Sequence, residues 1–421
     1  MSERGRILTV SNFFDSHRGG LEIVAGRLAR ELAGRGFTVT WLATDAAAPP
    51  EPTPGLTCVS MRAWNGTERR LGLPWPLLSP GAMARLWRET AAADAVLLHD
   101  SLYLTSIVTA LAARARRRPL VVVQHIGAIR YNNPLLRALM ALANRAVGAP
   151  LLARAHQVVF ISQVVREHFA RTRLGAAPEL IFNGVDTEVF RPGDAAERAA
   201  ARRRFGLPAE RMVALFVGRF VEKKGLAVLR EAAAIRPDVV FALAGWGPED
   251  PDAWGLANVR VFRGLAGAEL AELYRAGDAL VLPSRGEGFP LVVQEALAAG
   301  LPVVCGAESA AADPQAAILL HPIEVEGDPE AAALRVMGAL EAALAAGCEG
   351  AATRHEFARR RYGWPQAADR YAEILTRLVG DGGRSAGPAR NTPWRDGDAP
   401  PPTRECVGPS LFAYFRACLA G

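Results

Sequence analysis

The chain has 421 residues, a length that corresponds to two or three domains of about 150 residues each. Hydrophobic residues make up 50% and charged residues 22% of it, a balance that excludes a largely disordered protein. The net charge of +6 would suit an anionic partner, but an arginine- and alanine-rich composition set by genome base content is the favoured explanation.

The five cysteines are far apart and never in C-x-x-C spacing, which disfavours a disulfide scaffold or a zinc ribbon and indicates a reducing compartment. The first residues run directly into the strand-like segment 7–10 without an apolar h-region, so we expect no signal peptide. No uninterrupted apolar stretch approaches the 18 or so residues of a membrane span. We therefore expect a cytoplasmic protein, either free or at the cytoplasmic face of the membrane.

Short β-branched segments alternate with Ala-, Leu- and Arg-rich segments of helical period, which is typical of parallel sheets built from β-α-β units. A glycine pair precedes a helix expected over residues 21–34, with Gly36 as its C-cap. The arginine run at 114–118 is expected to decorate a helix end, a solvated position being favoured over contact with lipid headgroups. The strands expected in this first half are 6–11, 38–43, 95–99, 120–124 and 157–161.

The alternation lapses between residues 183 and 211, where we place a hinge, and then restarts. Strands are expected there at 212–217, 239–244, 259–262, 279–282 and 302–304. The pattern predicts an α/β protein with two Rossmann-like domains whose parallel sheets face each other across a cleft. The expected parts are an N-terminal domain 1–185, a C-terminal domain 186–362, a helix 363–380 and a largely disordered Gly/Pro-rich tail 381–421.

The segment from Pro283 to Val304 is the most informative, because it follows a buried strand, turns, and becomes a helix at about Pro290. A proline in the first helical turn costs little, and the free N–H groups there form a site for phosphate. Glu287 in the turn and Glu295 in the helix are each able to accept hydrogen bonds from the vicinal hydroxyls of a ribose or a hexose. Alone, this pair would indicate only a capped and solvated helix.

A second candidate site follows the strand that ends at Gly218. Arg219 and Lys224 lie on the loop before a helix that is expected to begin near Leu226. Two fixed cations beside a helix N-terminus are suited to neutralise a diphosphate leaving group. Lys223 is expected to be solvated instead.

In the first half, Gly19 and Gly20 permit a close backbone approach to a ligand, although a simple tight turn explains them almost as well. His125 follows a strand at its carboxyl end, where cleft residues are expected, and a purely structural role for it is an equal alternative. The D-x-D triplets 250–252 and 396–398 are not anchored at strand ends, so we expect no metal ion. The G-x-G at 245–247 lacks a third glycine in dinucleotide spacing, which disfavours a nicotinamide cofactor.

Taken together and in their order along the chain, these motifs resemble those of the group 1 family of retaining glycosyltransferases (family 4), which have the GT-B fold. The resemblance covers about residues 6–380, and the helix after Tyr362 resembles the family's terminal segment, which crosses back to the first domain. The motifs that carry it are Gly19-Gly20 with Glu22, His125, Phe182-Asn-Gly-Val-Asp186, Gly218-Arg219 with Lys224-Gly225, Gly245-x-Gly-Pro248, Phe262-x-Gly264, Leu273-Tyr274 with Ala276-x-Asp278, and the Glu287–Glu295 segment.

The resemblance implies a glycosyltransferase (EC 2.4) that moves a sugar from a nucleotide-diphospho-sugar to a hydroxyl group and retains the configuration of the anomeric carbon. It would act in the synthesis of an envelope glycan, a polysaccharide or a glycolipid. The second domain would bind this donor, a substrate rather than a cofactor, and the first a glycan, lipid-linked or small-molecule acceptor; no nucleic acid is expected. The resemblance implies that Arg219 and Lys224 bind the diphosphate, and that Glu295 binds the ribose. It also implies that Glu287 binds the transferred sugar and that His125 lies near the anomeric centre. Further donor contacts are implied at Gly19, Gly20, Gly264, Gly288, Phe289, Pro290, Leu291 and Val292.

The chain departs from the family pattern at two places. The usual Gly-Gly-x-x-Glu segment is replaced by residues 305–313, and Pro290 stands where glycine is commoner, so donor identity stays open. Another GT-B enzyme is an alternative: an epimerase would need a closed acid/base pair and no acceptor, and a phosphorylase a lysine-bound cofactor. An inactive sugar-nucleotide-binding or assembly protein is a further alternative.

Overall fold

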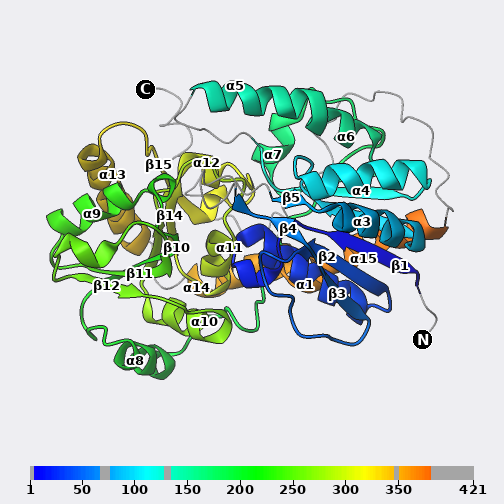
Figure 1. The fold of residues 1–421 in the computed structure, drawn as a ribbon. Coiled ribbons are helices and arrows are strands. Elements are labelled where there is room, and N and C mark those ends of the chain that lie inside the picture. Colours follow the sequence, from blue (N-terminus) through cyan, green and yellow to red (C-terminus); the bar gives the residue numbers. More distant parts are fainter. Residues whose placement is uncertain (1–3, 67–75, 128–133, 346–349, 381–421) are drawn as a thin grey trace, which may run out of the picture. The chain divides into compact units, whose positions relative to one another are not determined.

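The computed structural model describes residues 4–66, 76–127, 134–345 and 350–380, which are coloured in Figure 1. Seven strands form a first, fully parallel sheet in the order β3-β2-β1-β6-β7-β8-β9. Its strands are β1 (Arg6–Val10), β2 (Thr38–Thr44), β3 (Leu56–Met61), β6 (Ala95–His99), β7 (Leu120–Gln124), β8 (Gln157–Phe160) and β9 (Glu179–Leu180).

Six strands form a second parallel sheet in the order β12-β11-β10-β13-β14-β15. These strands are β10 (Val213–Arg219), β11 (Val240–Trp246), β12 (Val259–Phe262), β13 (Ala279–Leu282), β14 (Val303–Gly306) and β15 (Leu320–Ile323). A short antiparallel ribbon joins β4 (Ala63–Trp64) to β5 (Leu77–Leu78). The two parallel sheets confirm the predicted pair of Rossmann-like units.

Helices connect the parallel strands, as such sheets require. Those of the first half are α1 (Gly20–Gly34), α3 (Pro80–Ala92), α4 (Leu104–Ala115), α5 (Pro134–Ala143), α6 (Ala149–Arg154) and α7 (Gln163–His168). Those that follow are α8 (Ala195–Arg204), α9 (Leu226–Ile235), α10 (Gly267–Ala276), α11 (Leu291–Ala298), α12 (Ala307–Ala310), α13 (Pro329–Ala345), α14 (Ala351–Tyr362) and α15 (Trp364–Gly380).

Helix α1 ends at Gly34, as predicted, but its C-cap lies one residue before the predicted glycine. Its C-cap is Arg35, and Gly36 follows it with a φ of 90°, the left-handed conformation in which glycine is favoured. The predicted C-cap at Gly36 is therefore wrong by one position. The glycine still ends the helix, because its conformation turns the chain toward β2.

Each sheet has its own hydrophobic core. Along the chain, membership changes from one core to the other after Ile181 and changes back after Tyr362. Buried residues between Phe182 and Tyr362 form the core of the second sheet. Buried residues between Ile7 and Ile181 form the other core, together with the buried face of α15 from Trp364 to Leu375. The last described helix thus packs with the first half of the chain, and the predicted tail 381–421 lies outside the described residues.

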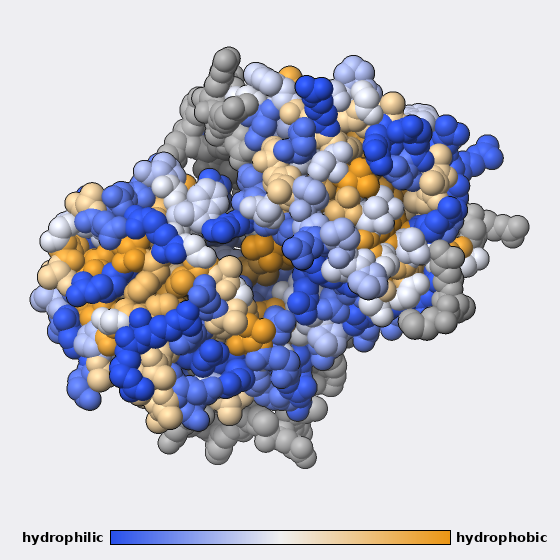
Figure 2. All heavy atoms as spheres, turned by 60° about the horizontal axis from the view of Figure 1, so that its bottom comes forward, coloured by the Kyte–Doolittle hydropathy of each residue, from blue (hydrophilic) through white to orange (hydrophobic). Residues whose placement is uncertain are grey.

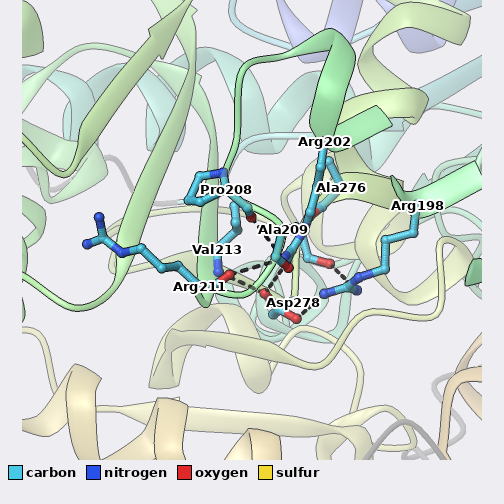
Figure 3. Close-up of polar contacts among 9 residues, drawn as sticks. Arg198, Arg202, Pro208, Ala209, Arg211, Val213, Ala276 and Asp278 are labelled. Carbon is cyan, nitrogen blue, oxygen red and sulfur yellow. Dashed lines mark hydrogen bonds and ion pairs between the residues drawn. The ribbon is translucent and has the colours of Figure 1, made fainter. Parts of the chain in front are cut away.

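A buried arginine fastens α8 to the second sheet (Figure 3). The guanidinium of Arg202 donates to Asp278 at 2.6 Å and to the carbonyl of Ala276 at 3.0 Å. Asp278 also accepts from the N–H of Val213, at the start of β10, at 2.7 Å. Further carbonyl acceptors of Arg202 come from Pro208, Ala209 and Arg211. Because almost no water reaches this guanidinium, these contacts replace its hydration.

Large apolar side chains are not confined to the two cores. Figure 2 shows one face on which hydrophobic residues lie between hydrophilic ones. Exposed apolar side chains occur on α4, α5 and α13, where Leu111, Leu142 and Leu334 are 60%, 61% and 61% exposed. None of the described helices is both long and apolar enough to cross a membrane.

Candidate active site

A buried ion pair joins two loops at the carboxyl edge of the second sheet. Lys224, on the loop between β10 and α9, places its Nζ 3.1 Å from Oε1 of Glu287, and Lys223 approaches the same oxygen at 3.5 Å. Burial raises the pKa of Glu287, but the two ammonium groups outweigh it and hold that pKa below its usual value. Burial likewise lowers the pKa of Lys224 despite this carboxylate. Glu287 is thus ionised and paired, and it does not cap α11, whose N-cap is Pro290.

Glycine makes this loop contact possible. Gly225, directly after Lys224, has a φ of 78°, and a Cβ there would lie 2.1 Å from the carbonyl oxygen of Pro283. Any side chain would push the two loops apart. The Lys-Gly pair in the sequence therefore has a steric reason as well as an electrostatic one.

Glu295 lies on α11 and points back to α10, where the hydroxyl of Tyr274 donates to its Oε2 at 2.9 Å. Burial raises the pKa of Glu295 to about 7, against the effect of this hydrogen bond. The carboxyl is therefore not on a solvated helix face. The helix begins at Leu291, which confirms the predicted start at about Pro290, but the proline is the N-cap and not part of the first turn.

Arg219 ends β10 in register with Trp246, which ends β11. Its guanidinium lies over the indole ring at 4.9 Å, a cation–π contact at a partly exposed edge. Five residues further along the chain, Lys224 lies beside Gly218, where a Cβ would be 3.8 Å from the Lys224 side chain, and the charge of Arg219 contributes to the lowered pKa of Lys224. The structure thus brings Arg219, Lys224 and Glu287 to one end of the second sheet.

His125 follows β7 in the first sheet, and its Nε2 lies 3.1 Å from Nδ1 of His99. One oxygen of Asp100 accepts from the N–H groups of His125 and Ile126, at 3.0 and 3.1 Å. Burial lowers the pKa of His99 to about 3 and that of His125 well below its usual value, so both imidazoles are neutral. Burial raises the pKa of Asp100 to about 7, and its φ of 66° is unusual for a residue other than glycine.

Glycines bring the turn that carries Glu287 against the first sheet. A Cβ on Gly288 would lie 2.7 Å from the carbonyl oxygen of His125, so only glycine fits there without a shift. A Cβ on Gly20, at the start of α1, would lie 3.7 Å from the side chain of Leu291. A Cβ on Gly19 would meet the carboxylate of Glu22 at 2.0 Å.

Three other residues predicted to contact the donor have different surroundings. The side chain of Phe289 is buried, with ring centroids 5.8 Å from Phe182 and 5.6 Å from Tyr362, and so belongs to the core. Pro290 has no N–H and cannot donate to phosphate. Gly264 is exposed after the edge strand β12, with open space at its side-chain position.

The structure also gives partners to a D-x-D triplet. Asp250 and Asp252 pair with Arg263 at 2.6 and 2.5 Å, which accounts for both carboxylates. In the described ranges, no group of three or more His, Cys, Asp or Glu side chains is placed to hold a metal ion. The triplet 396–398 lies outside those ranges.

The sequence did not predict which side chains contact the candidate site residues Glu295 and His125. Tyr274 was part of a motif but had no assigned contact with Glu295, and Asp100 followed a strand without an assigned role. Both contacts link residues more than 20 positions apart, and no local spacing or period indicates them. A strand-end position was the one signal for Asp100.

Known proteins are similar to this chain along most of its length. A family model described as Glycosyltransferase Family 4 matches residues 18–189, and one described as Glycosyl transferases group 1 matches residues 211–341. The D-inositol 3-phosphate glycosyltransferase 1 of Catenulispora acidiphila is 32% identical over 87% of this chain and 92% of its own length. The chain belongs to the group 1 glycosyltransferases of family 4. The predicted family and the predicted EC 2.4 transferase activity are confirmed.

A second relative of this glycosyltransferase, from Streptomyces avermitilis, is also a D-inositol 3-phosphate glycosyltransferase and is 32% identical over 85% of this chain and 83% of its own length. Solved structures confirm the GT-B fold. The structure of HepE of Anabaena in complex with UDP-glucose has a TM-score of 0.67 at 19% sequence identity, and the match covers 89% of this chain and 100% of HepE. Sucrose-phosphate synthase of Thermosynechococcus elongatus has a TM-score of 0.66 at 19% identity, with 89% and 99% covered.

Proposed function

We propose that this glycosyltransferase takes its sugar from a nucleotide-diphospho-sugar held by the second sheet. The observation that carries the proposal is the placement of Arg219 and the Lys224–Glu287 pair at the carboxyl edge of that sheet. Two cations there balance a diphosphate, and charged hydrogen bonds to it contribute about 1.5–3 kcal/mol each. HepE, a protein of this fold, was crystallised with UDP-glucose, which supports a donor of this class.

The other donor contacts follow from the same placement. Glu295 accepts hydrogen bonds from the ribose hydroxyls, and Glu287 holds the transferred sugar. Leu291 and Val292 supply free backbone N–H groups at the start of α11, where the helix dipole favours the negative charge of phosphate. No metal ion is needed in this scheme, because Arg219 and Lys224 carry the compensating charge.

We propose that the transfer retains configuration at the anomeric carbon. Lys224 and Lys223 engage the carboxylate of Glu287 before a donor binds, and the hydroxyls of the transferred sugar engage it afterwards, which leaves it poorly suited to act as a nucleophile. The acceptor oxygen then bonds to the anomeric carbon on the face from which the diphosphate departs, and the acceptor proton passes to a phosphate oxygen. Neutral His125 lies where it can donate or accept a hydrogen bond without adding charge.

The acceptor binds at the carboxyl end of the first sheet, beside His125 and Asp100. The relatives named D-inositol 3-phosphate glycosyltransferases support a polyhydroxylated acceptor. We propose that the enzyme acts in the synthesis of an envelope glycan, a polysaccharide or a glycolipid. Its acceptor would be a small molecule or a lipid-linked molecule.

A thermal-shift screen with UDP-, GDP- and ADP-sugars, followed by a donor-hydrolysis assay, tests this function. A bound donor raises the melting temperature, and slow release of nucleoside diphosphate identifies an active transferase. Failure of every donor to shift the melting temperature would contradict the donor site. Binding without any release would instead indicate an inactive sugar-nucleotide-binding protein.

We further propose that the enzyme acts at an anionic membrane surface. Leu139 and Leu142 of α5 are 51% and 61% exposed and three residues apart, and so they share one helix face. The 66 residues 101–166 contain no Asp or Glu and nine arginines: Arg114, Arg116, Arg117, Arg118, Arg130, Arg137, Arg145, Arg154 and Arg166. The excess of positive charge in this segment complements anionic lipid.

Vesicle sedimentation tests this surface. We expect the wild type to bind phosphatidylcholine vesicles that contain phosphatidylglycerol, to bind weakly to phosphatidylcholine alone, and to dissociate at high salt. The double variant Leu139→Gln, Leu142→Gln should lose binding, whereas Leu334→Gln on α13, an equally exposed leucine at 61%, should not. Equal binding by both variants would show that α5 is not the contact.

A further inference from the structure

The segment 305–313, where the chain departs from the family pattern, lies against the turn that carries Glu287. The carboxylate of Glu308, in the first turn of α12, accepts a hydrogen bond from the N–H of Gly286 at 2.8 Å. Gly286 has a φ of 68° and directly precedes Glu287. The side chain of Glu308 is therefore attached one residue away from the carboxylate that pairs with Lys224.

Backbone contacts hold the same turn from two sides. The N–H of Arg285 donates to the carbonyl of Lys223 at 2.9 Å. A Cβ on Gly306 would lie 2.5 Å from the carbonyl oxygen of Ser284, so the end of β14 touches the turn directly. These contacts fix the start of the turn, and Glu308 holds the next peptide toward Glu287.

We propose that Glu308 is a positioning residue, whose carboxylate holds the Gly286 amide and thereby sets where Glu287 presents its own carboxylate to the transferred sugar. The proposal rests on the proposed function of Glu287. Glycine in a left-handed conformation has little intrinsic preference for it, so release of its amide lets the peptide rotate. A displacement of about 1 Å at a reacting centre lowers turnover by up to about 100-fold.

An oxygen acceptor at the right distance, rather than negative charge, is what this role requires. Glu308→Gln keeps an acceptor oxygen at the same reach, whereas Glu308→Asp keeps the charge but shortens the side chain by one methylene. The two variants therefore separate positioning from electrostatics. Glu330→Ala serves as the control, since Glu330 is an exposed glutamate in the first turn of α13.

The experiment measures nucleoside diphosphate release from the nucleotide sugar, the Kd of the nucleoside diphosphate alone, and the melting temperature. We expect Glu308→Ala and Glu308→Asp to lower kcat about tenfold or more, and Glu308→Gln and Glu330→Ala to stay within about threefold of the wild type. None of the four variants should weaken nucleoside diphosphate binding by more than about twofold, because Arg219, Lys224 and Glu295 bind that part of the donor.

Three results would overturn the proposal. Wild-type kcat in Glu308→Asp and Glu308→Ala would show that the contact has no role in turnover. An active Glu308→Asp beside an impaired Glu308→Gln would assign the effect to charge, and parallel losses in kcat and nucleotide affinity would assign it to general loosening of the site. A wild type that binds no nucleoside diphosphate would refute the proposed function first, so the two failures are distinguishable.

Discussion

Replacement of Glu295 by glutamine tests stability and binding at the same side chain. Burial raises its pKa from 4.5 to about 7 in the folded chain. Between these values the folded protein keeps a proton that the unfolded chain has released, so the free energy of unfolding falls as the pH rises through this window. The shift corresponds to a loss of at most about 3 kcal/mol once the pH exceeds 7.

Glutamine imitates the protonated carboxyl, because it is neutral and still accepts from Tyr274. Without ligand, Glu295→Gln should therefore match the wild type at pH 5 and be more stable at pH 8, by up to about 3 kcal/mol. Nucleotide binding should change in the opposite direction. Loss of charged hydrogen bonds to the ribose should weaken binding at pH 8 by about 1.5–3 kcal/mol.

Denaturant unfolding at pH 5 and pH 8, together with calorimetric titration of the nucleoside diphosphate, measures both effects. The comparison with the variant is needed because burial also raises the pKa of Asp100 to about 7, which gives the wild type a second pH dependence of the same sign. If Glu295→Gln lost the same free energy of unfolding at both pH values, the conclusion that burial raises the pKa of Glu295 would be wrong. Unchanged nucleotide affinity would remove Glu295 from the ribose.

Four further outcomes are expected. Arg219→Ala should lower kcat more than donor affinity in steady-state kinetics, because the leaving diphosphate gains charge in the transition state; equal losses would indicate uniform binding. Gly288→Ala should reduce kcat/KM by about 100-fold, since its Cβ would lie 2.7 Å from the His125 carbonyl, and wild-type rates would show that the contact is dispensable. Arg202→Met should cost about 3 kcal/mol in denaturant unfolding, because the buried carbonyls that Arg202 bonds lose their donor while Arg198 still pairs with Asp278, and a loss below about 1 kcal/mol would contradict that role. EDTA should leave donor hydrolysis intact, and abolition would revive a metal site.

Strands were predictable where burial on both faces makes the segment continuously apolar. β6, β7 and β13, which are buried throughout, begin and end at the predicted residues. The edge strand β12 also matches its predicted bounds, although Arg260 interrupts it and it is partly exposed. β3, β9 and β15 were missed for physical reasons. β3 alternates apolar with polar residues at a sheet edge, β9 has two residues, and β15 contains a proline, which is unfavourable inside a strand.

The candidate site was predictable where a residue and its reason lie close in sequence. Arg219 ends a strand and Lys224 lies on the loop that follows, and glycines beside them mark the backbone contacts that the structure contains. The partners of these residues were not predictable. Glu308 meets Gly286 across 22 positions and Tyr274 meets Glu295 across 21, and such contacts depend on how strands β13 and β14 and helices α10 and α11 pack.

The charges of the ligand-free site are largely cancelled before a donor arrives. Lys224 is balanced by Glu287, both buried histidines are neutral, and the raised pKa values of Glu295 and Asp100, about 7 each, leave these carboxyls only partly ionised near pH 7. A diphosphate that binds Lys224 competes with Glu287 for the same ammonium group. The carboxylate that it releases then needs new donors, and the hydroxyls of the transferred sugar supply them. Binding of the two halves of the donor is therefore coupled through Lys224, so a nucleoside diphosphate without its sugar should leave part of this exchange incomplete.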